Sequence, residues 1–182
     1  MKIEPLKILG AFKISPKKIQ DSRGIFGRMF CAKEFENHGM NTQWVQMNTS
    51  ISSVRGTARG LHYQRPPHSE IKLVRCVRGK IIDIILDLRK KSPSYGCICS
   101  INLDSKNMDM LYIPDGCAHG FQALTDNVEL HYCHSKFYEP QFEAGINLLD
   151  PDLAINWPLP LLNLSFKDAN YPLFKKTESL IL

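Results

Sequence analysis

Short runs of β-branched and aromatic residues, separated by turn residues, fill the chain between residues 44 and 138 and constrain its fold more than any other feature. The runs expected to form strands are Trp44–Ser50, Thr57–Tyr63, Ile71–Val77, Lys80–Leu88, Cys97–Leu103, Met110–Ile113, Gly120–Leu124 and Val128–Tyr138. Arg78-Gly79 is predicted to be a tight hairpin turn between two of them. Many short strands with few helical segments predict a sandwich or barrel, not a sheet that alternates with helices.

The segments on either side of this region are less regular. Two further strand-like runs, Leu6–Ile14 and Ile25–Phe30, precede it and are joined by a polar stretch with a turn at Gly24. Ala32–His38 is rich in helix formers and is followed by glycine, which predicts one short helix. Beyond residue 139, proline and aspartate interrupt the apolar residues, so we expect an irregular C-terminal arm that still packs on the core.

Composition indicates one globular domain over residues 1–182, with 43% hydrophobic and 23% charged residues. The net charge of +5 comes from scattered basic residues, which favours a local anion site over nucleic-acid binding. No apolar run approaches the roughly 20 residues that span a bilayer, so no membrane partner is expected. The six cysteines form no CxxC pair and no export signal precedes them, so we expect free thiols and a cytoplasmic protein.

Asp83 does not suit an ordinary hydrophobic core. It lies in IIDIILDL among aliphatic neighbours, where an unpaired carboxylate costs several kcal/mol. If the strands on either side of Arg78-Gly79 pair, Asp83 falls opposite residue 74 and within reach of Lys72. We therefore expect Asp83 and Lys72 to form a polar cluster in a barrel mouth, the alternative being an edge strand with Asp83 facing water.

Two histidines in glycine-containing motifs, and two arginines that each adjoin a glycine, are candidates for a functional site. His62 lies in RGLHYQ and His119 in PDGCAHGF. Imidazole has an unperturbed pKa near neutrality, which suits it to proton abstraction. Arg23 and Arg59 each stand beside a glycine, where a guanidinium can approach a phosphate with little steric competition.

Tyr132 is a further candidate because of its place in the run VELHYCHSKFY. In a strand it shares one face with Leu130 and His134, while their neighbours point to the other face. An amphipathic strand with a packed Tyr132 would produce the same periodicity. The alternation alone therefore leaves both a structural and a chemical role open.

Segments of uncommon polar residues follow one another in a characteristic order between Phe12 and Asp168. They are Arg59–Gln64 (RGLHYQ), Lys72–Arg75 (KLVR), Gly79, Asp83, Asp87–Arg89 (DLR), Ser92-Pro93, Ile113–Phe121 (IPDGCAHGF) and Asn156–Pro158 (NWP). This pattern resembles the dTDP-4-dehydrorhamnose 3,5-epimerase family. The resemblance implies a mainly β double-stranded β-helix, a cupin-like jelly roll, with a short N-terminal helix and an irregular C-terminal arm.

The same resemblance implies an isomerase that inverts C3 and C5 of a dTDP-4-keto-6-deoxyhexose, converting dTDP-4-dehydro-6-deoxyglucose to dTDP-4-dehydrorhamnose. No metal or organic cofactor is implied. His62 would remove the proton beside the C4 ketone, and Asp168, in the sequence SFKD, would orient it. Lys72, held by Asp83, would stabilise the enolate oxygen, and Tyr132 would return the proton on the far face.

The resemblance also implies a set of substrate-binding residues: Arg23, Phe26, Gln46, Asn48, Arg59, His119 and Tyr138. Arg59 and His119 would hold the diphosphate, and Tyr138 would stack on the base. Arg23 and Phe26 would reach into the partner subunit's site. The implied assembly is therefore a homodimer with shared sites.

Related activities fit the same residues. An epimerase that inverts only C3, or one that acts on another 4-keto sugar, would keep His62 and Tyr132. This chain has Arg28 and Thr49 where the best-known members of the family carry glutamate and histidine. Both positions adjoin the expected substrate site, so the reaction type is better indicated than the sugar or the base.

Two other classes of protein also fit parts of the sequence. A metal-dependent cupin would use His119 in the PxGxxH motif, with His62, His68 and Glu70 imitating the first metal motif. The usual close HxH pair is absent, however. A sugar-binding module without activity would have lost His62 or Tyr132, and both are present.

Overall fold

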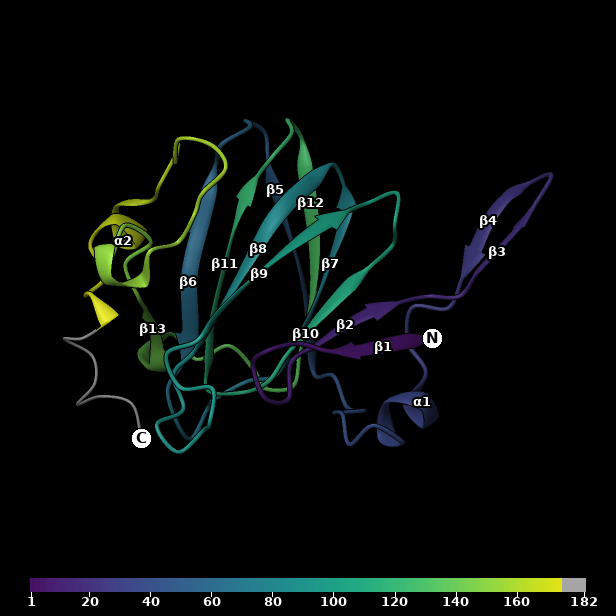
Figure 1. Cartoon of the computed structure of the whole chain (residues 1–182), viewed down its shortest axis with the longest axis horizontal. Coiled ribbons are helices and arrows are strands. Elements are labelled where there is room, and N and C mark those ends of the chain that lie inside the picture. Colours follow the sequence, from purple (N-terminus) through teal and green to yellow (C-terminus); the bar gives the residue numbers. More distant parts are fainter. Residues whose placement is uncertain (175–182) are drawn as a thin grey trace.

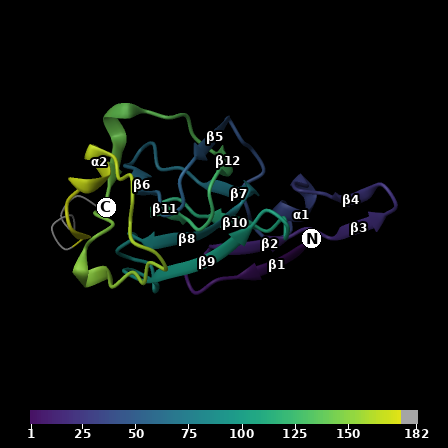
Figure 2. The ribbon, with the colours of Figure 1, turned by 90° about the horizontal axis from the view of Figure 1, so that it is seen from above.

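The computed structural model describes residues 1–174 and contains two antiparallel sheets that face each other (Figures 1 and 2). The strand order is β1-β2-β10-β7-β12-β5 in the six-stranded sheet and β13-β6-β11-β8-β9 in the five-stranded sheet. Their bounds are β1 (Lys2–Pro5), β2 (Phe12–Ser15), β5 (Gln46–Ser52), β6 (Ala58–Gln64), β7 (Lys72–Arg78), β8 (Lys80–Asp87), β9 (Ile98–Asp104), β10 (Met110–Ile113), β11 (Cys117–Ala123), β12 (Val128–His134) and β13 (Glu143–Gly145). The predicted jelly roll is confirmed.

The remaining elements are short. β3 (Lys18–Asp21) and β4 (Gly24–Gly27) form a hairpin that projects away from the sheets in both views (Figures 1 and 2). The predicted helix is present as α1 (Ala32–Glu36), and α2 (Phe166–Ala169) lies in the C-terminal arm. Two 3-10 turns, η1 (Pro140–Phe142) and η2 (Pro151–Leu153), lie between β12 and α2.

Two sequence predictions about connections are wrong. The stretch before Gly24 was expected to be a polar connection, but it contains β3. Arg78-Gly79 was expected to close a hairpin, but β7 pairs with β10 and β12 while β8 pairs with β9 and β11. The turn therefore carries the chain from one sheet to the other, since a glycine with φ of 80° permits either connection.

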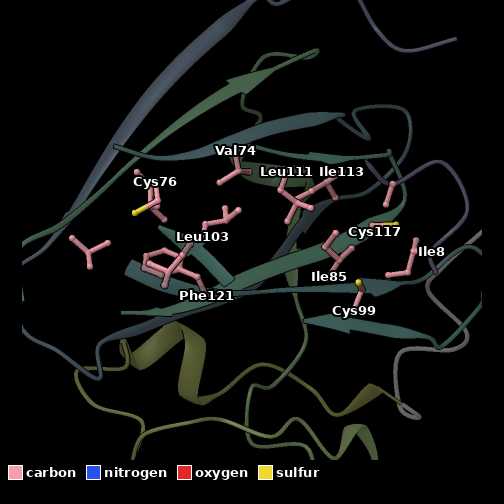
Figure 3. Close-up of a cluster of buried hydrophobic side chains, with 14 of the residues drawn as sticks. Ile8, Val74, Cys76, Ile85, Cys99, Leu103, Leu111, Ile113, Cys117 and Phe121 are labelled. Carbon is pink, nitrogen blue, oxygen red and sulfur yellow. The ribbon is translucent and has the colours of Figure 1, made fainter. Parts of the chain in front are cut away.

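The main core lies between the two sheets (Figure 3). Inward residues of the six-stranded sheet, among them Val74 and Leu111, meet Ile85 and Phe121 from the five-stranded sheet. These side chains are 0–2% exposed. Alternate residues of each strand therefore supply the core, as the period-two patterns require.

The outer faces of both sheets are also partly covered. Phe35 of α1 and Met40 pack on the six-stranded sheet. The C-terminal arm packs on the five-stranded sheet through Ile146, Leu148 and Leu153. The expected irregular arm with apolar anchors is confirmed, and its packing brings α2 against β6.

All six cysteines carry free thiols, as expected. Within residues 1–174, no helix has the length and apolar character needed to cross a bilayer.

The Asp87 carboxylate organises the loop after β8 and supplies a stability prediction. It is fully buried and accepts hydrogen bonds from the Arg89 guanidinium at 2.8 Å and from the Ser92 and Ser94 hydroxyls at 2.7 Å. Burial alone would raise its pKa, but these donors outweigh burial and lower the pKa to about 2. The folded state therefore binds this proton more weakly than the unfolded chain does.

Asp87→Asn is expected to lower the free energy of unfolding by about 2 kcal/mol at neutral pH. Because the folded pKa is depressed, the stabilisation is present above about pH 4 and is lost as the pH falls towards 2. Urea denaturation of both proteins over this range should show the difference shrinking. Asp115→Asn, at an exposed position, is the matched control. A difference that is independent of pH would contradict the assigned role.

Candidate active site

A cavity of about 580 Å³ opens between the two sheets. β5, β7 and β12 supply one side and β6 and β11 the other. The residues expected from the sequence that line it are Asn48, Arg59, His62, Lys72, His119, Tyr132 and Tyr138. Asp168 and Asp83 lie behind it, each paired with one of its histidines. Segments more than 100 residues apart in sequence thus meet at one site.

His62 of β6 points into the cavity and is anchored from behind. Its Nε2 lies 2.6 Å from Oδ1 of Asp168, and its side chain is 34% exposed whereas that of Asp168 is 5% exposed. Ser165 caps α2 by accepting a hydrogen bond from the Asp168 backbone N–H at 3.0 Å. Although burial opposes ionisation of Asp168, the hydrogen bond with His62 contributes most to holding its pKa below the ordinary value. The imidazole therefore faces a fixed carboxylate at one nitrogen.

The backbone beside His62 approaches β11 closely. Gly60 has φ of 124°, and a Cβ there would lie 2.5 Å from the Cα of Gly120. A Cβ on Gly120 would in turn meet the Arg59 carbonyl oxygen at 2.6 Å. Glycine is needed at both positions because the backbones of the paired strands β6 and β11 approach too closely there for side chains. The antiparallel pairing of β6 and β11 places His62 opposite His119, and both side chains line the same cavity.

Lys72 enters the cavity from β7 and is held by two groups. Its Nζ lies 3.2 Å from Oε1 of Glu70 and donates to the His62 carbonyl oxygen at 3.2 Å. The side chains of Lys72 and Glu70 are both 8% exposed. The carboxylate that contacts Lys72 is therefore that of Glu70. From the sequence, Glu70 was expected only as a ligand in the alternative of a metal-dependent cupin.

Asp83 has a different partner from the one expected. It is fully buried, and its Oδ1 lies 2.8 Å from Nε2 of His119. Burial raises the pKa of Asp83, and the charge of His119 opposes this more strongly than that of Lys72 does. The direct Asp83–Lys72 pair was deduced from a hairpin that does not form, because β7 and β8 lie in different sheets. Lys72 contacts Glu70 and His62 instead, and its effect on Asp83 is to lower the pKa of that carboxyl through its charge.

Tyr132 faces the cavity from β12, opposite β6. Its hydroxyl lies 3.2 Å from that of Ser50, and its ring packs edge-on to His119 with centroids 6.1 Å apart. Burial raises the pKa of Tyr132, and the Ser50 hydroxyl only partly offsets this. The phenol is therefore held protonated at neutral pH. The structure confirms the predicted shared face of Leu130, Tyr132 and His134. Leu130 is buried between the sheets, and Tyr132 and His134 line the cavity.

The mouth of the cavity carries an aromatic ring and a charged pair. Tyr138 is 50% exposed, and its hydroxyl donates to Glu143, which also pairs with Lys167. Burial opposes ionisation of Glu143, but Lys167 chiefly keeps its pKa below the ordinary value. Gln46 does not line the cavity itself, but it accepts a hydrogen bond from the Tyr138 backbone N–H at 3.1 Å and donates to Asn48 at 3.2 Å.

Arg59 is available at the cavity wall, whereas two other expected binding residues lie elsewhere. The Arg59 guanidinium donates to the Ser52 hydroxyl at 3.4 Å and to the Ile51 carbonyl oxygen at 3.3 Å. Arg23 pairs with Asp21 on the β3–β4 hairpin, outside this cavity, and Phe26 of the same hairpin is 67% exposed. They do not contribute to the site of their own chain.

The residues considered for a metal site do not converge. The His68 ring packs against Phe142 in a tilted arrangement with centroids 4.2 Å apart, while Glu70 faces Lys72 and His134. Within the part of the chain that the structure describes, no group of three or more histidine, cysteine or acidic residues is arranged to hold a metal ion.

Sequence reasoning missed several residues that belong to the site. Ser50, Glu70, His134 and Glu143 line the cavity, and Tyr171 packs edge-on to His62 with centroids 5.7 Å apart. Alternation along the strand gives a signal for Ser50, two residues after Asn48, whereas Glu70 precedes β7 and has no such signal. His134 was placed on the correct face but given no role.

Comparisons with known proteins agree on one family. The family model described as dTDP-4-dehydrorhamnose 3,5-epimerase matches residues 5–176. A dTDP-4-dehydrorhamnose 3,5-epimerase of Methanothermobacter thermautotrophicus is 41% identical over 165 residues, which cover 89% of this chain and 88% of the relative. A dTDP-4-dehydrorhamnose 3-epimerase of Streptomyces niveus is 40% identical over 172 residues, which cover 93% and 83%.

A solved structure extends this agreement to the fold. The dTDP-6-deoxy-D-glucose-3,5-epimerase of Legionella pneumophila, in complex with dTDP-4-keto-L-rhamnose, superimposes with a TM-score of 0.92. It is 37% identical, and the match covers 100% of this chain and 96% of that one. Sequence, fold and relatives lead to the same conclusion: this chain belongs to the dTDP-4-dehydrorhamnose 3,5-epimerase family.

Proposed function

We propose that this protein epimerises C3 and C5 of a dTDP-4-keto-6-deoxyhexose, producing dTDP-4-dehydrorhamnose. The observation that carries the proposal is that His62 and Tyr132 enter one cavity from opposite sheets, with Lys72 in the same lining. Inversion at a carbon next to a ketone needs a base on one side, an acid on the other and a donor for the enolate oxygen. The dTDP-sugar bound by the Legionella pneumophila relative supports the ligand class.

Proton removal is the first half of each inversion. His62 accepts the proton from the carbon beside the C4 ketone, and the bonding electrons form a carbon–carbon double bond and place negative charge on the C4 oxygen. Asp168 stabilises the imidazolium that results. The Lys72 ammonium donates to the C4 oxygen, and its charge stabilises that oxygen more than it would in water because the Lys72 side chain is only 8% exposed.

Proton return completes the inversion. Tyr132 protonates the same carbon from the opposite side, and the electrons flow back to restore the ketone. The raised pKa of Tyr132 supports this role, because the hydroxyl enters the reaction protonated. Exchange with solvent then returns a proton to Tyr132 and removes one from His62. The same pair of groups serves the second carbon after the sugar turns or shifts.

The remaining cavity residues fit a nucleotide diphosphate. Arg59 offers charged donors to the diphosphate, and His119, held at Nε2 by Asp83, lies beside it in the lining. Tyr138 presents an exposed ring on which a base can stack. A nucleotide-sugar substrate and six free thiols support a cytoplasmic enzyme.

The test is incubation of the protein with dTDP-4-keto-6-deoxyglucose, followed by NMR assignment of the configuration at C3 and C5. Inversion at both centres is expected. Inversion at C3 alone would make this chain a C3 epimerase, the activity in the name of the Streptomyces niveus relative. Unchanged substrate would reject the proposal for this sugar.

We further propose a homodimer in which the β3–β4 hairpin completes the partner's site. Ile19 and Phe26 lie opposite each other in this hairpin and are 57% and 67% exposed. Met47 and Ile51 of the edge strand β5 are 63% and 54% exposed. Apolar residues on a projecting hairpin and on an open sheet edge favour burial against another chain.

Mixing two inactive variants tests the shared site. An Arg23→Ala, Phe26→Ala chain and a His62→Ala chain are each expected to have low activity. In mixed dimers, one of the two sites would have both an intact hairpin and an intact His62, so about a quarter of wild-type activity should return after random exchange. Activity equal to the sum of the separate variants, or a monomer by light scattering, would contradict the shared site.

A further inference from the structure

Glu70 is a buried carboxylate that lies between Lys72 and His134 in the cavity wall. Its Oε1 is 3.2 Å from Lys72 Nζ, and its Oε2 is 3.2 Å from Nδ1 of His134. Gln64 also donates to Oε2, at 3.0 Å. The Glu70 side chain is 8% exposed, so these contacts replace nearly all of its water. A carboxylate buried in this way is stable only if its partners remain in place.

The charge of Glu70 is well defined by these contacts. Burial by itself would raise its pKa, but the hydrogen bond with His134 and the charge of Lys72 outweigh burial, so the pKa lies below its ordinary value. Glu70 is therefore ionised at neutral pH. His134 in turn approaches Asn48 through Nε2, with 3.4 Å between the nitrogens, which connects Glu70 to a second part of the cavity wall.

The geometry at Lys72 limits where its ammonium can point. An ammonium has three N–H donors. One is directed to Glu70 and one to the His62 carbonyl oxygen, each at 3.2 Å. Within the described residues these are its hydrogen-bonding contacts, so the third donor is available to an oxygen in the cavity. Without Glu70 the long side chain would keep only one of its two restraints.

We propose that Glu70 is a positioning residue that fixes the Lys72 ammonium against the C4 oxygen of the substrate, with His134 supporting Glu70 from the other side. The inference rests on the proposed function, in which Lys72 stabilises the enolate. It replaces the role expected for Asp83, whose close partner is His119. Glu70 acts through Lys72, so its effect should follow the enolate charge and not the affinity for the nucleotide.

This role predicts a specific kinetic pattern for Glu70→Gln. The variant keeps the size of the side chain but loses its charge, and a hydrogen bond between charged groups accounts for roughly a 10- to 100-fold effect. We expect kcat to decrease by roughly 10- to 100-fold while KM changes less than about twofold. Deuterium exchange from solvent at C3 and at C5 should fall by the same factor, because both enolates place their charge on the same oxygen.

A double-mutant cycle with Lys72→Met separates positioning from a general structural role. If Glu70 acts through Lys72, Glu70→Gln should lower the exchange rate of the Lys72→Met protein by less than about twofold. Equal losses in both backgrounds would overturn the proposal. Glu36→Gln, at an exposed position of α1, is the control and should leave kcat unchanged.

A conservative variant keeps the test decisive if Glu70→Gln fails to fold. Glu70→Asp retains the charge on a shorter side chain, so its kcat should lie closer to wild type than that of Glu70→Ala, with circular dichroism to verify both folds. Equal activity of the two variants would count against the proposal. If the wild-type protein leaves the dTDP-4-keto sugar unchanged, the proposed function is rejected. If the wild-type protein is active and Glu70→Gln has the same kcat, only the role of Glu70 is rejected.

Discussion

His62→Ala is expected to lower kcat for epimerisation about 10³-fold and to remove solvent exchange at both C3 and C5. His62 is the histidine of the cavity that combines an accessible ring, 34% exposed, with a buried carboxylate 2.6 Å from its Nε2. Because one base serves both carbons, the two exchange rates should fall together. Proton NMR in deuterated water, with thermal unfolding to verify the fold, measures both.

His38→Ala is the matched control for His62→Ala. His38 is exposed just after α1, where its Nδ1 approaches the Glu34 carbonyl oxygen, and it does not line the cavity. His38→Ala should retain wild-type kcat. Exchange at the wild-type rate in His62→Ala would show that another group removes the proton, and the assignment of the base would be wrong.

Tyr132→Phe is expected to separate exchange from inversion. The ring would still fill its buried position, but the hydroxyl that meets Ser50 at 3.2 Å would be lost. His62 could then remove a proton and return a deuteron from the same side, so labelled substrate of unchanged configuration should accumulate. Formation of inverted product should fall by roughly 10²-fold or more, the range for loss of a general acid.

Tyr112→Phe is the control for this second prediction. Tyr112 is also a buried strand tyrosine with a hydroxyl hydrogen bond, which it accepts from the Asn41 backbone N–H, but it lies outside the cavity. Its replacement should leave both exchange and inversion intact. If Tyr132→Phe lost both in equal proportion, Tyr132 would be required for proton removal, and the division of roles between the two sheets would be wrong.

The sequence predicted the strands well because alternation and turn residues act locally. Pairing between strands is not local. Arg78-Gly79 has the same turn signal whether it closes a hairpin or links two sheets, and only packing of the whole barrel decides. The expected contact of Asp83 with Lys72 failed for this reason.

The candidate site was predicted partly by chemistry and partly by resemblance. The glycine-containing motifs RGLHYQ and PDGCAHGF indicated His62 and His119. The link from His62 to Asp168 spans 106 residues and came only from the family pattern, since no spacing rule predicts it. The contact between Glu70 and His134 was not predicted, because it depends on the register between β7 and β12 and on a connecting segment outside both strands.

Incorporation of deuterium from solvent by the wild-type protein tests the central claim most directly. With dTDP-4-keto-6-deoxyglucose in deuterated water, the product should carry deuterium at C3 and at C5, each inverted, because each proton leaves to His62 and each replacement comes from Tyr132. Sugar recovered with no more deuterium than a protein-free sample would contradict the account.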